Sequence, residues 1–170
     1  MKALVSHQLV RFLEARGVEH IFGLCGHTNI AVLTALEGSK IKFVNTRHEQ
    51  VAAHAADGYA RMADKPASTL LHLGPGLANG LANLHNAKKA RTPVVNIVGE
   101  HATYHREYNA PLTSDIEGLA HPMSSWVRTG MSATEIGSDG AAAIAAARTA
   151  PGQVATLILP ANTAWDPGTG

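Results

Sequence analysis

The segment that decides the fold is Arg47-His48-Glu49-Gln50-Val51-Ala52-Ala53-His54-Ala55-Ala56-Asp57-Gly58-Tyr59-Ala60-Arg61. It places one carboxylate, Glu49, where a run of small residues with helical periodicity begins, and it predicts a helix over residues 49–62. A first-turn acid is stabilised by the helix dipole, so Glu49 has two explanations from this segment alone. It is either an ordinary helix residue or a functional group.

Short apolar runs alternate with helical patterns on both sides of this segment. Strands are predicted over residues 20–23, 41–45, 68–73, 93–98, 126–128 and 154–159, and further helices over 7–15, 29–36, 77–90, 116–119 and 139–149. Ser6 is the expected N-cap of the first helix, and Gly17 its expected stop. Continuously apolar strands are typical of a sheet buried on both faces. The sequence therefore predicts an α/β fold of three layers, in which helices cover both faces of a doubly wound, mostly parallel sheet of about six strands.

Composition narrows the class of protein. The chain has 170 residues, 14 basic and 13 acidic, with a net charge of +1, so we expect one domain and no nucleic-acid partner. The single Cys25 excludes an intrachain disulfide, and the first residues lack the apolar stretch of a secretory signal. Both observations favour a reducing, cytoplasmic setting. No apolar run approaches the roughly 20 residues that span a bilayer, so no membrane association is expected.

In open α/β sheets, ligands bind beyond the carboxyl ends of the strands. Four predicted loops lie there, over residues 23–28, 45–49, 74–79 and 99–105. The third, Gly74-Pro75-Gly76-Leu77-Ala78-Asn79, has Asn79 where a dinucleotide fingerprint needs its third glycine. Glu100 could imitate the acid that binds ribose, so an NAD(P)-binding oxidoreductase domain stays open as the weakest alternative.

No metal ligand is assigned within the chain. A zinc-protease helix that began at His48-Glu49 would need its second histidine at Ala52. His101 and His105 have i, i+4 spacing, but they fall in an apparent loop without a carboxylate or cysteine at a fixed offset.

Five motifs follow one another along the chain. They are Phe22-Gly23-Leu24-Cys25-Gly26, the segment from Arg47 to Arg61, Gly74-Pro75-Gly76 with Asn79, Pro93-Val94-Val95 with Gly99, and His121-Pro122 ahead of Trp126. Taken in order, they resemble the N-terminal pyrimidine-binding domain of the acetolactate synthase, benzoylformate decarboxylase and pyruvate decarboxylase superfamily, whose cofactor is thiamine diphosphate. The resemblance runs from about residue 4 to residue 160.

The resemblance assigns Glu49 as the carboxylate that hydrogen-bonds the cofactor's aminopyrimidine and so promotes loss of the thiazolium proton, while the cofactor serves as electron sink for decarboxylation. It implies that Gly26, Gly74, Pro75, Gly76 and Asn79 line the cofactor site. The implied function is a decarboxylase or carboligase of 2-oxo acids, similar to acetolactate synthase. A noncatalytic regulatory or interaction domain of the same fold is the alternative.

Substrate contacts carry over at three positions. His27 stands where relatives have an Asp or a Ser that meets the substrate, and His72 stands where benzoylformate decarboxylases have a catalytic histidine. A buried strand histidine satisfied by its neighbours is the other explanation of His72. Leu112 occupies the place of the glutamine in acetolactate synthases, so the identities of the 2-oxo acid and the acceptor stay open.

The same resemblance implies that residues 1–165 form the pyrimidine-binding domain and that residues 166–170 begin a linker or tail. The family's Mg²⁺ and diphosphate are held by a second domain, through a Gly-Asp-Gly followed by an Asn, which this chain lacks. We therefore expect the chain to need the diphosphate-binding domain of another subunit, in a homodimer or homotetramer, and to be inactive alone. A truncated enzyme and a separately encoded subunit both fit.

Overall fold

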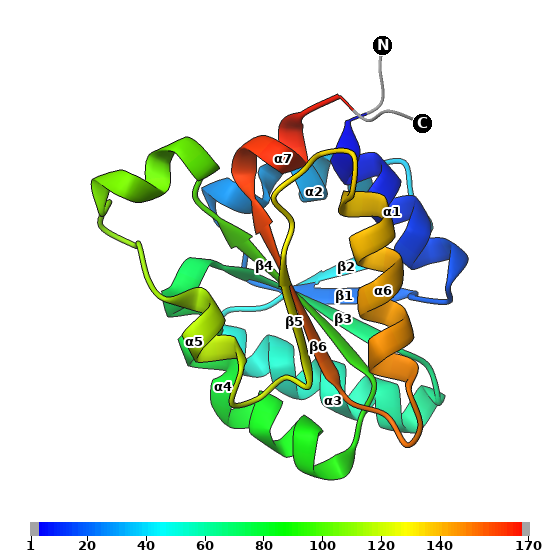
Figure 1. The fold of residues 1–170 in the computed structure, drawn as a ribbon. Helices are drawn as coiled ribbons and strands as arrows, with labels where there is room; N and C mark the ends of the chain where they lie inside the picture. Colours follow the sequence, from blue (N-terminus) through cyan, green and yellow to red (C-terminus); the bar gives the residue numbers. More distant parts are fainter. Residues whose placement is uncertain (1–3, 168–170) are drawn as a thin grey trace.

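The computed structural model describes residues 4–167, which form one α/β unit (Figure 1). Its strands are β1 (His20–Gly23), β2 (Lys42–Asn45), β3 (Ala67–His72), β4 (Val94–Glu100), β5 (Trp126–Thr129) and β6 (Val154–Pro160). Its α-helices are α1 (Val5–Ala15), α2 (Ile30–Leu36), α3 (Glu49–Ala63), α4 (Leu73–Ala90), α5 (Ile116–Ala120), α6 (Ile136–Arg148) and α7 (Ala161–Trp165). Two 3₁₀ helices, η1 (His27–Asn29) and η2 (Thr103–Tyr108), lie between them.

The six strands form one sheet in the order β2-β1-β3-β4-β6-β5, and every neighbouring pair of named strands is parallel. The chain runs from β1 to β2 on one side and then returns to place β3 on the other side of β1. At this reversal the carboxyl ends of β1 and β3 lie side by side, and no helix connects β1 directly to β3. Such switch points are where α/β sheets bind ligands.

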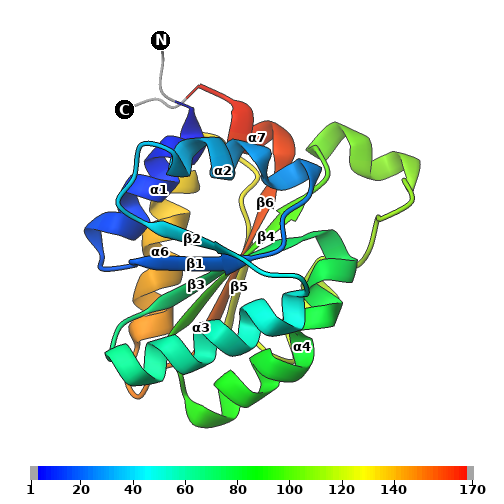
Figure 2. The same cartoon turned by 180° about the vertical axis from the view of Figure 1, so that it is seen from behind.

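Two apolar cores lie on opposite faces of the sheet. Helices α1, α2, α6 and α7 cover one face, around Leu9, Ile21 and Leu157, which are fully buried. Helices α3, α4 and α5 cover the other, around Leu71, Leu77 and Val98 (Figure 2). The three-layer, doubly wound fold and the six strands predicted from the sequence are thus confirmed.

Two local predictions were wrong, and one helix was not predicted. Helix α1 begins after Leu4, with no side-chain cap, and the hydroxyl of Ser6 is buried without a hydrogen-bond partner. Residues 74–79 are not a loop, because α4 begins at Leu73 and takes them into its first turns. The sequence also gave no sign of α7, which follows β6 directly.

The predicted tail starts in contact with the domain. The backbone amide of Val5 donates to the carbonyl of Asp166 at 3.0 Å, and Pro167 makes an isolated bridge with Leu4. Residues 168–170 lie outside the described part of the chain, as do residues 1–3. Among the described helices, none combines the length and apolar character that crossing a bilayer requires.

Gly23 offers a test of how tightly β1 and β3 approach. A Cβ on Gly23 would lie 2.5 Å from the backbone carbonyl oxygen of Leu70. We predict that Gly23→Ala lowers the free energy of unfolding in urea by about 1–3 kcal/mol, because the backbone atom cannot move aside. The matched control is Gly58→Ala, which lies mid-helix with nothing within 4 Å and should raise stability by about 0.5–1 kcal/mol. Equal stability of the Gly23 variant and the native chain would contradict this packing.

Candidate functional site

The switch point brings together the predicted site residues from three elements. β1 ends at Gly23 and leads to Gly26 and His27, β3 ends at His72, and α3 begins at Glu49 after β2. These segments are far apart in sequence, yet all lie at the carboxyl edge of the sheet. The structure therefore brings these predicted residues together at one edge of the sheet.

Glu49 is the first residue of α3 and is only 8% exposed. The side-chain amide of Asn79, on α4, donates to its Oε2 at 3.0 Å. Its Oε1 faces Gly76, where a Cβ would lie 3.3 Å away. Within the described residues, Oε1 receives no hydrogen bond. One carboxylate oxygen is thus fixed by Asn79, while the other lies close to Gly76, which has no side chain to crowd it.

Local sequence explains this placement. The Nδ1 of His48 accepts from the backbone amide of Gln50 at 3.2 Å and so caps α3, which fixes the turn that carries Glu49. α4 starts at Leu73, whose φ of 56° makes the abrupt change from strand to helix. Pro75 then lies in the first turn, where its missing N–H costs no helical hydrogen bond.

His72 packs directly on Gly26. A Cβ on Gly26 would come within 1.9 Å of the imidazole Cδ2, so only glycine leaves room for this ring. The Nε2 of His72 is buried and has no hydrogen-bond partner among the described residues. Burial lowers the pKa of His72 from its usual 6.5; the carboxylate of Glu49 opposes this, and His101 and His27 add to the lowering. The predicted site residues Glu49 and His27 therefore both act electrostatically on His72.

Comparison with known proteins assigns the family. The sequence model described as "Thiamine pyrophosphate enzyme, N-terminal TPP binding domain" matches residues 4–125. The chain belongs to this family. It is 50% identical over 164 residues, 96% of its length, to the provisionally named acetolactate synthase large subunit IlvX of Mycobacterium tuberculosis, of which it covers 32%.

Two further relatives agree. The mitochondrial acetolactate synthase catalytic subunit of Aspergillus candidus is 37% identical over 112 residues, which are 65% of this chain and 16% of that protein. Among solved structures, the thiamine diphosphate-dependent 4-hydroxybenzoylformate decarboxylase of Rhodococcus jostii RHA1 has the same fold. Its TM-score is 0.93 at 22% identity, over 99% of this chain and 32% of that one. The chain thus spans about a third of the length of the IlvX relative, although the match covers 96% of this chain.

The role of Asn29 in this thiamine diphosphate-binding domain was not predicted from the sequence. Its side-chain amide donates to the carbonyl of Leu71 at 3.1 Å, and its Oδ1 accepts from the amide of Gly26 at 3.2 Å. A Cβ on Gly99 would lie 2.6 Å from the same amide nitrogen. Asn29 therefore ties the loop after β1 to β3 and β4. Its only sequence signal was a polar residue at the expected start of a helix.

The remaining predicted residues lie at the rim. His27 is the exposed first residue of η1, and Leu112 is 41% exposed between η2 and α5. The hydroxyl of Ser114 donates to the carbonyl of Leu112 at 3.2 Å, and Ser114 also fills the space beside Gly74. The segment with Leu112 thus passes over the start of α4, and a substrate contact by its side chain stays a prediction.

The NAD(P)-binding alternative loses its support. Glu100 is 2% exposed, and its Oε1 accepts from the backbone amide of His101 at 2.7 Å, so this carboxylate is committed to its own loop and is not free for a ribose. Cys25 packs against the core, and burial raises the pKa of its thiol to about 12, which makes it a poor nucleophile. No group of three metal-ligating side chains occurs within residues 4–167.

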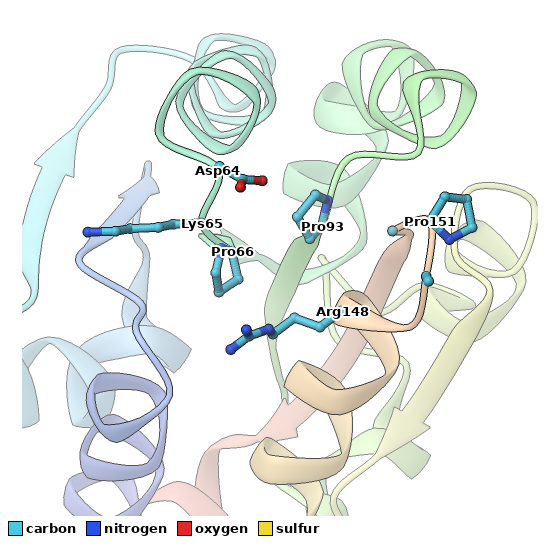
Figure 3. A pocket seen from close by; sticks show the side chains of 8 residues that line it. Asp64, Lys65, Pro66, Pro93, Arg148 and Pro151 are labelled. Carbon is cyan, nitrogen blue, oxygen red and sulfur yellow. The ribbon is translucent and has the colours of Figure 1, made fainter.

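A hollow of about 320 Å³ lies at the opposite edge of the sheet (Figure 3). Asp64, Lys65 and Pro66 line it before β3, and Pro93 lines it before β4. Arg148, the last residue of α6, and Pro151, between α6 and β6, complete the lining shown in the figure. These are the amino ends of the strands. The hollow contains no predicted site residue, and it lies away from the switch point where α/β sheets bind their ligands.

The half-buried ring of His72, whose Nε2 is fully buried, makes stability depend on pH. Because its pKa is lowered in the folded state, the unfolded chain binds more protons below about pH 6.5, and stability falls as the pH falls through that value. We predict that His72→Gln reduces the loss of unfolding free energy between about pH 8 and about pH 5.5, measured by urea denaturation. An identical loss in both proteins would contradict the burial of a neutral imidazole.

Proposed function

We propose that this chain supplies the pyrimidine half of the active site in a thiamine diphosphate-dependent 2-oxo acid decarboxylase or carboligase, with Glu49 as the activating carboxylate. The observation that carries the proposal is the buried carboxylate itself, which has one oxygen held by Asn79 and one facing Gly76. Relatives named acetolactate synthase support the carboligase class.

The residues present fit the pyrimidine part of the cofactor. A flat ring needs an open face beside the carboxylate, and Gly76 provides it because any Cβ there would lie 3.3 Å from Oε1. Gly26 and Gly74 allow close packing instead. The space that a side chain would take at each glycine is filled by His72 and Ser114, respectively. The cofactor, when bound, supplies the carbanion and the electron sink. Within this chain, Oε1 of Glu49 is the atom that holds the exchangeable proton, and Asn79 fixes its direction.

The histidines belong to the substrate side of the proposal. A lowered pKa keeps His72 neutral near physiological pH, so its ring is ready to accept a proton rather than to donate one. His27 is exposed at the same edge and is placed to meet an incoming 2-oxo acid. Leu112 is assigned to the apolar part of the substrate.

A partner subunit completes the proposed site. Val51 on α3 is 54% exposed two residues after Glu49, and Gln50, Val51, His54 and Asn83 surround a shallow hollow of about 290 Å³ on the outer face of α3 and α4. An exposed apolar side chain in a hollow beside the site favours a protein partner. We assign it to the diphosphate-binding domain of another subunit, which would carry the Mg²⁺, in a cytoplasmic homodimer or homotetramer.

Replacement of Glu49 tests the proposal. In the complete enzyme, formed with the diphosphate-binding domain, Glu49→Gln should lower kcat for a 2-oxo acid by about 100-fold or more, because the amide cannot exchange the proton. The free energy of unfolding should change little. The matched control, Glu37→Gln, changes an exposed glutamate at the end of α2 and should keep full activity. Normal turnover by the Glu49 variant would overturn the assignment and favour a noncatalytic domain.

The incompleteness of the site gives a second test. Because the described chain offers no cluster of metal ligands, we predict that it alone binds thiamine diphosphate weakly, with no gain on addition of Mg²⁺. Addition of the diphosphate-binding domain should make binding tight and dependent on Mg²⁺. Calorimetric titration measures both, and tight Mg²⁺-dependent binding to the lone chain would contradict the division of the site.

A further inference from the structure

The side chain of Asn29 bridges backbone groups of two separate segments. Asn29 is 1% exposed, and its Nδ2 donates to the carbonyl of Leu71, near the end of β3, at 3.1 Å. Its Oδ1 accepts from the backbone amide of Gly26, in the loop after β1, at 3.2 Å. The parallel pairing of β1 with β3 ends at Gly23 and Leu70. The amide of Asn29 thus continues the link between the two strand ends where their backbone pairing stops.

The two residues that Asn29 joins lie on either side of His72. Leu71 precedes His72 in the chain, and Gly26 lies against its ring, since a Cβ on Gly26 would come within 2.4 Å of the ring atoms Cδ2, Nε2 and Cγ. The buried Nε2 of His72 has no hydrogen-bond partner among the described residues, so packing rather than a bond at this atom holds the ring. Its position therefore depends on the distance between the loop and β3, which Asn29 sets.

We propose that Asn29 is a positioning residue of the active site: by tying the loop after β1 to the end of β3, it holds the ring of His72 where it meets the substrate. The inference rests on the proposed function, since that is what places His72 on the substrate side. Neither the family match nor the names of the relatives assign Asn29 a role. Asn29 acts through His72 and touches neither substrate nor cofactor itself.

The surroundings of Asn29 require both the size of its side chain and both of its hydrogen-bonding groups. A Cβ on Gly99 would lie 2.6 Å from Nδ2, so β4 packs directly on the amide and a longer side chain would not fit. Aspartate would keep the acceptor for Gly26 but bring a buried charge against the carbonyl of Leu71, and alanine would leave both backbone groups unpaired. Either change removes the restraint between loop and strand. Misplacement of a reacting group by about 1 Å can lower a rate by about 100-fold.

NMR of the native chain tests this geometry without any variant. The side-chain amide protons of Asn29 should exchange with solvent much more slowly than those of Asn86, which is exposed on α4. The ring protons of His72 should show Overhauser contacts with the α protons of Gly26. Fast exchange of the Asn29 amide, or no contact between the ring and Gly26, would overturn the proposal.

Removal of the amide in the complete enzyme separates positioning from stability. Asn29→Ala should lower kcat for a 2-oxo acid by about 10- to 100-fold, while deuterium exchange at C2 of the cofactor, which depends on Glu49, stays near the native rate. The matched control is Asn96→Ala. Asn96 is fully buried in β4, accepts from Thr69 and donates to Thr156, so its loss should lower stability similarly but keep kcat. Unchanged kcat in Asn29→Ala, an equal loss of kcat in Asn96→Ala, or an equal loss of C2 exchange would overturn the proposal.

A double-mutant cycle identifies the residue through which Asn29 acts. His72→Gln should lower kcat on its own, and Asn29→Ala should then cause little further loss. Additive losses, or full activity of His72→Gln, would overturn the proposal. Asn29→Asp, which keeps the acceptor for Gly26, takes the place of the alanine variant if that variant does not fold. If Glu49→Gln leaves turnover intact, the proposed function fails, whereas the NMR contacts still decide whether Asn29 holds the ring of His72.

Discussion

The close approach of α3 and α4 is the constraint on which the site depends. A Cβ on Gly80 would lie 3.8 Å from the Cβ of Ala53 and 3.9 Å from the carbonyl oxygen of Glu49, so the two helices meet through atoms next to the backbone. This approach brings Asn79 to the carboxylate of Glu49 and leaves Gly76 opposite its free oxygen. The alanine and glycine content of these helices is therefore a requirement of the site as well as of the core.

A second set of close contacts holds the substrate side. The ring of His72 lies against Gly26, Asn29 links the loop after β1 to Leu71, and Gly99 makes room for Thr28 and Asn29. The first two contacts join the loop after β1 to the end of its neighbour β3, and the third joins that loop to β4, on the far side of β3. Rigid packing of this kind fixes the directions of the imidazole and carboxylate groups before any ligand arrives, which lowers the cost of ordering them on binding.

The sequence predicted what depends on local patterns. Short apolar runs that alternate with helical patterns predicted all six strands. The position of an acid at the start of a small-residue helix singled out Glu49 as a candidate. The turn at Leu73 was missed, because its positive φ is imposed by the junction of β3 with α4, and a Gly-Pro-Gly pattern reads as a loop. The contacts of Asn29 with Gly26 and Leu71 were missed because they follow from strand order.

We propose that Glu49 exchanges a proton with the aminopyrimidine and so activates the cofactor. The most direct test is the rate at which the C2 proton of thiamine diphosphate exchanges with deuterium in the complete enzyme. This rate is compared between the native protein and Glu49→Gln. We predict that exchange slows by about 100-fold or more in the variant, although the cofactor still binds. An unchanged exchange rate with bound cofactor would contradict the account.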